Sequence, residues 1–169
     1  MDDFDDLTTA NAAYAGTFTL GHLPAPPRRK LAVVTCMDCR IDPLAVLGLE
    51  PGDAHVLRNA GARITDDVLR SLVKSVNQLG VTRVAVMHHT DCGAAKIVLS
   101  ELREKVRTIT GNDPDEVEFH LIDDPDAALA ADIGALRDYP YLPAGTAVAG
   151  YMYDVTTGVA ERRHSTAVA

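Results

Sequence analysis

Residues 33–42 read VVTCMDCRID, an apolar run that changes abruptly into two cysteines, an aspartate and an arginine. Residues 83–93 read RVAVMHHTDCG and change in the same way, from apolar residues to histidines, an aspartate and a cysteine. Short runs rich in β-branched apolar residues predict buried strands. Because both strands end in groups that bind metals well, we predict that they end at the same metal ion.

The rest of the chain alternates strand-like runs with helical patterns. Strands are predicted at 31–35, 54–59, 82–88, 146–155 and 159–163, and helices at 4–15, 43–47, 66–79, 94–109 and 125–139. This alternation predicts an α/β fold with a mainly parallel sheet flanked by helices, and the last two strands should add an antiparallel hairpin at one edge. We expect the strand order 2-1-3-4, because it places the carboxyl ends of the first and third strands side by side.

Length and composition indicate the domain organisation and argue against a nucleic-acid-binding or membrane-spanning protein. The chain has 169 residues, of which 47% are hydrophobic, and a net charge of −8. We expect a single domain over 1–169, with an N-terminal helix and extended arm in 1–27 and the metal-binding core in 28–163. The negative charge argues against nucleic acid as a partner, and no apolar run approaches the ~18 residues of a membrane span. The acidic N-terminus lacks the features of a secretory signal, so we expect a cytoplasmic protein.

The predicted metal ligands are Cys36, His89 and Cys92. His89 and Cys92 are three residues apart at a strand end, a spacing that can place both side chains on one ion. Two thiolates and an imidazole suit Zn²⁺, which we expect at one ion per chain. Three protein ligands leave the fourth position of zinc free, as in catalytic sites.

Cys39 leaves two other interpretations open. It could complete a closed structural zinc site with three cysteines and one histidine, in a non-catalytic module that binds a protein partner. Cys36 and Cys39 could also form a thioredoxin-like redox motif, although the histidine and cysteine of the other strand would then be unexplained. A structural site gives no role to Asp38 and Arg40, so we favour the three-ligand site.

These motifs together resemble those of the β-class carbonic anhydrases. The resemblance covers roughly residues 28–155 and is carried by C-x-D-x-R at 36–40, R-N-A-G at 58–61, T-D-D at 65–67 and H-H-T-D-C-G at 88–93. It implies a zinc lyase, a carbonate dehydratase, that reversibly hydrates carbon dioxide to bicarbonate and a proton through a zinc-bound hydroxide. Carbonyl sulfide or carbon disulfide hydrolysis on the same scaffold is the alternative, because those substrates are also linear and apolar.

The resemblance also implies roles for residues around the metal. Asp38 and Arg40 form the expected catalytic pair, in which Asp38 held by Arg40 accepts a hydrogen bond from the zinc-bound hydroxide. Released from Arg40, Asp38 could become a fourth zinc ligand in a closed form. Asn59, Gly61 and Gly93 are expected to shape the substrate pocket.

The family usually dimerises through its N-terminal helix and sheet edge. Leu7 and Tyr14 are apolar residues of that helix in this chain, so we expect a homodimer, with a tetramer as the alternative. Cys39 replaces a residue that is usually serine or alanine, and we expect it to pack as a small buried group rather than act as an oxidisable thiol. We expect His88 to pack behind the metal ligands and Asp91 to cap the next helix rather than pair with a cation.

Overall fold

Five strands of residues 4–169, the part of the chain that this computed structural model describes, form one sheet. They are β1 (Leu31–Cys36), β2 (Ala54–Asn59), β3 (Arg83–His89), β4 (Ala147–Tyr153) and β5 (Ala160–Ala167). Their order is β2-β1-β3-β4-β5, in which the first four strands are parallel and β5 is antiparallel to β4. The predicted α/β class, the 2-1-3-4 order and the antiparallel edge are confirmed.

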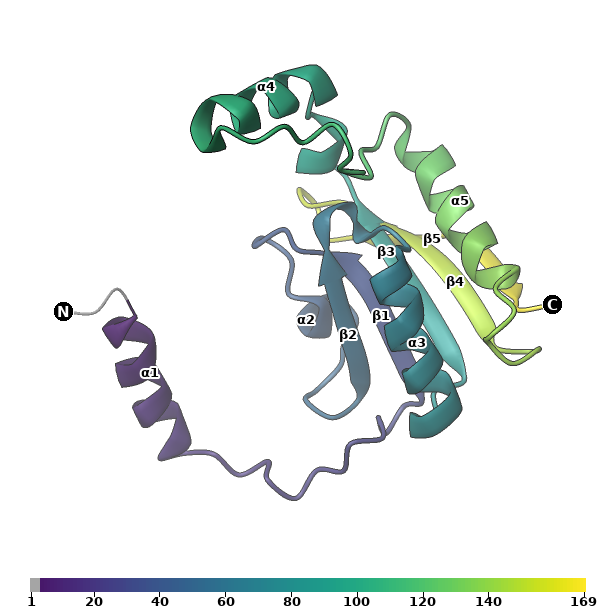
Figure 1. The fold of residues 1–169 in the computed structure, drawn as a ribbon. Helices are drawn as coiled ribbons and strands as arrows, with labels where there is room; N and C mark the ends of the chain where they lie inside the picture. Colours follow the sequence, from purple (N-terminus) through teal and green to yellow (C-terminus); the bar gives the residue numbers. More distant parts are fainter. Residues whose placement is uncertain (1–3) are drawn as a thin grey trace.

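Helices connect these strands. They are α1 (Asp5–Ala15), α2 (Pro43–Val46), α3 (Asp66–Leu79), α4 (Leu99–Thr110) and α5 (Pro125–Arg137), with single 3₁₀ turns η1 (Ala60–Ala62) and η2 (Gly93–Ala95). Figure 1 shows α3 and α5 side by side on one face of the sheet. Leu72 of α3 and Leu129 of α5 are fully buried there against β1 and β3, whose apolar runs are buried along nearly their whole length. Within residues 4–169, every helix is too short or too polar to span a bilayer.

The sheet register brings the predicted ligands to one edge. Cys36, the last residue of β1, is paired with Asn59 of β2, and Thr35 is paired with Met87 of β3, two residues before His89. Parallel neighbours end at the same edge of a sheet, which is where ligands of open α/β folds bind. The loops that follow β1, β2 and β3 therefore meet at one place.

The helix after β3 begins later than predicted. The expected helix at 94–109 starts only at Leu99, because residues 93–95 form the tighter turn η2. In an α-helix the carbonyl of Ala94 would accept a hydrogen bond from the amide four residues later. Here it accepts one from the distant amide of Ile122. The returning strand is also longer than predicted: β5 continues to Ala167, and its antiparallel pairing extends along the full length of β4.

Two helices lie apart from this body. Helix α1 is joined to β1 by an extended arm, and none of its residues 5–15 is buried. Helix α4 projects from the opposite end of the molecule, and none of its residues 99–110 is buried (Figure 1).

Candidate metal centre

Cys36, His89 and Cys92 meet where β1 and β3 end. Each is buried and offers one ligand atom, and these atoms all lie within 4.8 Å of one another. The two sulfur atoms are 4.0 Å apart. In a tetrahedral site with Zn–S bonds of about 2.3 Å, two sulfurs are roughly 3.8 Å apart. The spacing of the three groups therefore fits zinc.

The imidazole of His89 is turned so that its metal-binding nitrogen is available. Its Nδ1 lies 2.8 Å from the carbonyl oxygen of Thr90, to which it donates, so Nε2 carries the lone pair. Nε2 is buried and has no hydrogen-bond partner among residues 4–169. A buried polar atom without a partner is rare and costly, and a metal ion shared with the two sulfurs would satisfy it.

The two thiols, whose sulfurs lie 4.0 Å apart, shift each other's pKa in opposite directions. The hydrogen bond from Cys92 lowers the pKa of Cys36 to about 3, an effect that burial opposes and the Gly61 amide, 3.4 Å from the sulfur, supports. The same hydrogen bond, together with burial, raises the pKa of Cys92. A second thiolate so close to the first requires a positive charge between them, which is what a bound divalent metal provides.

Asp38 lies beside this group and is held by Arg40. The guanidinium donates to both carboxylate oxygens, at 2.7 Å from Nη2 and 3.0 Å from Nε, and the Arg40 backbone amide donates at 2.9 Å. These hydrogen bonds hold the pKa of Asp38 well below its usual range. Oδ2 of Asp38 is 3.9 Å from Nε2 of His89, so an ionised carboxylate lies next to the metal position.

Arg40 is itself held by Asp91, which corrects the prediction that Asp91 caps a helix. Nη1 of Arg40 is 2.8 Å from Oδ2 of Asp91, and the Asp91 carboxylate also pairs with Lys96. Lys96 and Arg40 together lower the pKa of Asp91 to about 2. Asp91 has a left-handed backbone with φ of +58°, and η2 begins without a side-chain cap. Asp38, Arg40 and Asp91 thus form two consecutive ion pairs, which join the loop after β1 to the loop after β3.

Arg58 also supports the metal centre, a role that the sequence analysis did not assign to it. Its side chain donates to the carbonyl oxygens of Cys36 at 3.0 Å and Asp38 at 2.7 Å, and so holds the loop that carries both residues. Its place in the R-N-A-G segment was the signal that could have revealed this role. The sheet register places Arg58 opposite Thr35, one residue before the first ligand.

A pocket of about 240 Å³ opens beside the sulfur atoms. Gly61 and Gly93 line it, whereas Asn59 is not among the lining residues and donates from Nδ2 to the carbonyl oxygen of Arg63 at 2.7 Å. The opposite wall is apolar and was not predicted, because no periodic pattern marks it; it consists of Ile97, Leu102, Phe119 and Leu121.

The structure also bears on the predictions for His88 and Cys39. His88 is 2% exposed and lies 3.0 Å from Asp132, behind the ligands as expected. Cys39 is exposed, so the prediction that it packs as a buried group is wrong. It is the middle residue of the turn closed by the Arg40 amide and the Asp38 carboxylate, and it lies outside the group of metal-binding atoms.

Comparison with known proteins agrees with this geometry. The sequence model of the carbonic anhydrase family matches residues 31–114. β-Carbonic anhydrase 1 of Mycobacterium tuberculosis is 36% identical over 156 residues, which cover 91% of this chain and 93% of that protein. A carbon disulfide hydrolase of Acidianus sp. is 33% identical and covers 78% of this chain and 76% of its own length.

A solved structure shows the same arrangement of elements. The crystal structure of a carbonic anhydrase from Streptococcus mutans superposes with a TM-score of 0.91 at 41% identity, covering 97% of this chain and 99% of that one. β-Carbonic anhydrases are zinc enzymes, and the Cys36, His89 and Cys92 group has the atoms and spacing that zinc requires. The chain belongs to the β-carbonic anhydrase family.

Proposed function

We propose that this protein catalyses the reversible hydration of carbon dioxide to bicarbonate and a proton. The observation that carries the proposal is the unpartnered Nε2 of His89, which lies with two thiols at the end of an apolar pocket. Cys36, His89 and Cys92 would hold one Zn²⁺. When bound, zinc would lower the pKa of a coordinated water to about 7 and so supply a nucleophile at neutral pH.

Asp38 is assigned the role of hydrogen-bond acceptor for that water. Its carboxylate is ionised at neutral pH because Arg40 lowers its pKa, and it lies within 3.9 Å of the His89 nitrogen. Accepting a hydrogen bond from that water would orient the oxygen lone pair toward the pocket. Arg40 is assigned a positioning role, since it holds Asp38 away from the metal and thereby keeps the fourth position free for water.

The pocket favours a small apolar substrate. Gly61 and Gly93 keep the floor free of side chains, and Phe119 and Leu121 supply an apolar wall that cannot hydrogen-bond to bicarbonate. Carbon dioxide has no net dipole and is not penalised for leaving water in such a pocket, whereas charged bicarbonate is. The pocket thus admits the substrate and favours departure of the anionic product.

Stopped-flow measurement of CO2 hydration by the zinc-loaded protein, at pH 7 and pH 8.5, tests this proposal. Activity is expected to rise with pH, because the coordinated water titrates with a pKa of about 7. Asp38 does not contribute to the rise, since its lowered pKa leaves it ionised throughout this interval. A protein with one zinc per chain and no activity at either pH would contradict the proposal.

Carbon disulfide hydrolysis is the second candidate function. It is supported by the 33% identity to the hydrolase of Acidianus sp. and by the apolar wall of the pocket. Hydrogen sulfide release from carbon disulfide, measured on the same zinc-loaded preparation, compares the two activities directly. A higher kcat/KM for carbon disulfide than for carbon dioxide would make this the main function.

We also propose that the chain forms a homodimer through α1. Leu7 and Tyr14 are 61% and 57% exposed on this helix. An apolar groove on the sheet face opposite α3 and α5 has arginines at its rim, including Arg83 and Arg162, which suits an acidic helix. Packing of α1 against the groove of a partner protomer would bury both surfaces.

Light scattering after gel filtration tests the dimer. The wild-type chain should elute with twice its 18.1 kDa mass, and the double variant Leu7→Asp, Tyr14→Asp should elute as a monomer, because two buried charges would oppose docking. Ile109→Asp, at an exposed apolar residue of α4, is the matched control and should remain dimeric. A double variant that remains dimeric would show that α1 is not the contact, and a tetramer would reveal a second one.

A further inference from the structure

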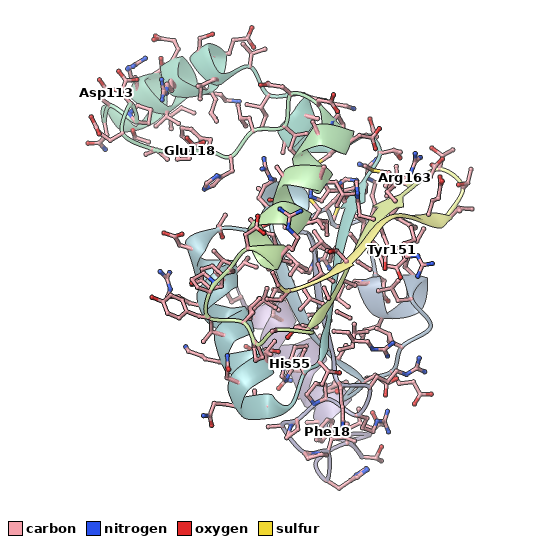
Figure 2. The ribbon with its side chains drawn as sticks, turned by 90° about the vertical axis from the view of Figure 1, so that its right-hand side faces the viewer. Phe18, His55, Asp113, Glu118, Tyr151 and Arg163 are labelled. Carbon is pink, nitrogen blue, oxygen red and sulfur yellow. The ribbon has the colours of Figure 1, made fainter. Side chains whose placement is uncertain are left out.

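The apolar wall of the pocket comes from a segment that leaves the body of the protein. Leu102, Phe119 and Leu121 all lie in residues 96–122, between η2 and α5. Figure 1 shows α4 projecting beyond the sheet, and Figure 2 shows Asp113 and Glu118 at the far end of this excursion. Because none of residues 99–110 is buried, the position of the wall depends on how residues 119–122 are attached.

Residues 119–122 are attached by the buried side chain of Ile122, which packs with Cys36 and Cys92, and by side-chain hydrogen bonds from Arg63. Nη1 of Arg63 donates to the carbonyl oxygens of Leu121 at 3.3 Å and His120 at 3.5 Å. The backbone adds a hydrogen bond from the Ile122 amide to the Ala94 carbonyl at 3.2 Å. His120 has φ of +51°, a left-handed conformation that costs a non-glycine residue energy and persists only when its surroundings hold it.

Arg63 is in turn held by a buried carboxylate. Its Nε lies 2.8 Å from Oδ2 of Asp132, a residue of α5 that is 3% exposed. The same carboxylate accepts a hydrogen bond from the Ile64 amide at 3.0 Å and lies 3.0 Å from Nε2 of His88. The guanidinium is therefore fixed by Asp132 of α5, which His88 of β3 also contacts, and its Nη1 reaches the wall.

We propose that Arg63, fixed by Asp132, is a positioning residue that ties residues 119–122 to the metal centre and thereby sets the shape of the substrate pocket. The tether is a structural property of this chain, and its kinetic consequence rests on the proposed function. Loss of the tether would loosen Phe119 and Leu121 without touching a metal ligand. Substrate binding would weaken, while chemistry at the metal would continue.

Hydrogen exchange on the zinc-loaded, full-length protein tests the tether. Arg63→Gln should raise exchange about 10-fold in peptides that cover residues 117–123, while peptides from β1 and β3 stay protected and zinc remains at one per chain. In the same variant kcat/KM for CO2 should fall about 10-fold, mainly through KM, because a binding surface is lost. Arg70→Gln is the matched control, since Arg70 pairs only with the exposed Asp67 in the contacts described, and it should change neither quantity.

Arg63→Lys distinguishes the effect of the hydrogen bonds to residues 120 and 121 from the effect of the ion pair with Asp132. Lysine keeps a positive charge beside Asp132 but cannot bridge a carboxylate and two carbonyls as a guanidinium does. The thermal stability of Arg63→Lys should therefore be near the wild-type value, while hydrogen exchange in residues 117–123 should be raised as in Arg63→Gln. The proposal is overturned if Arg63→Gln leaves this exchange unchanged, if exchange rises equally in β1 and β3, or if lysine restores full protection. If the wild type does not hydrate CO2, the proposed function fails, and the exchange results still decide the tether.

Discussion

Cys36→Ser is expected to reduce bound zinc to a small fraction of one per chain and to lower kcat/KM for CO2 hydration by about 1,000-fold or more. The serine hydroxyl does not ionise at neutral pH, so it replaces a thiolate whose pKa is lowered to about 3 by a group that binds zinc poorly. A metal ion supplies several kcal/mol of transition-state stabilisation, and each 1.36 kcal/mol corresponds to a tenfold change in rate.

Metal analysis by mass spectrometry, followed by stopped-flow kinetics, measures both effects. Cys39→Ser is the matched control, because the same substitution three residues later falls on an exposed thiol outside the ligand group. It should retain zinc and activity. Loss of zinc from Cys39→Ser as well as from Cys36→Ser would make Cys39 a fourth ligand and favour the structural zinc module.

Asp38→Asn is expected to lower kcat/KM by about 100-fold or more while zinc stays bound. Misplacement of a reacting group can cost about 100-fold, and asparagine has only one oxygen able to accept a hydrogen bond. Its amide hydrogens would also face the donors of Arg40, which now bond to both carboxylate oxygens. The residue would therefore lose both its charge and its orientation.

Zinc content and the pH profile distinguish this outcome from a folding defect. Asp42→Asn is the matched control, because Asp42 accepts from the amides of Leu44 and Ala45 at the start of α2, and asparagine caps helices about as well. Its activity should stay near that of the wild type. An Asp38→Asn protein with full activity would remove Asp38 from the mechanism, and one without zinc would make Asp38 a metal ligand.

Hydrogen bonds within the chain set the direction of the candidate ligands. Arg58 holds the carbonyls of Cys36 and Asp38, the Gly61 amide donates to the Cys36 sulfur, and Thr90 orients His89. Cys36 and His89 thus each have a partner that fixes their direction, as well-defined metal sites require.

Much of this architecture could be read from local patterns. The apolar runs at 33–36 and 83–87 predicted buried strands, and the alternation of strands and helices predicted a parallel sheet with ligands at its carboxyl edge. The same logic brought together Cys36 and Cys92, which are far apart in the chain and whose sulfurs lie 4.0 Å apart. Periodicity succeeds here because burial of a strand depends mainly on its own side chains.

Other features had no local signal. Cys39 is exposed because Asp38 and Arg40 close a turn around it, and Asp91 pairs with Arg40 because two loops face each other across the sheet edge. The late start of α4 at Leu99 follows from the use of the Ala94 carbonyl by Ile122.

The sequence by itself determined the fold class, the strand order and the three candidate metal ligands, because these depend on hydrophobic periodicity and on the chemistry of single residues. Only the tertiary structure decided the partners of Asp91, the exposure of Cys39 and the wall held by Arg63. Those features depend on which donors and acceptors from distant segments meet, and a hydrogen bond between distant residues leaves no periodic pattern in the chain.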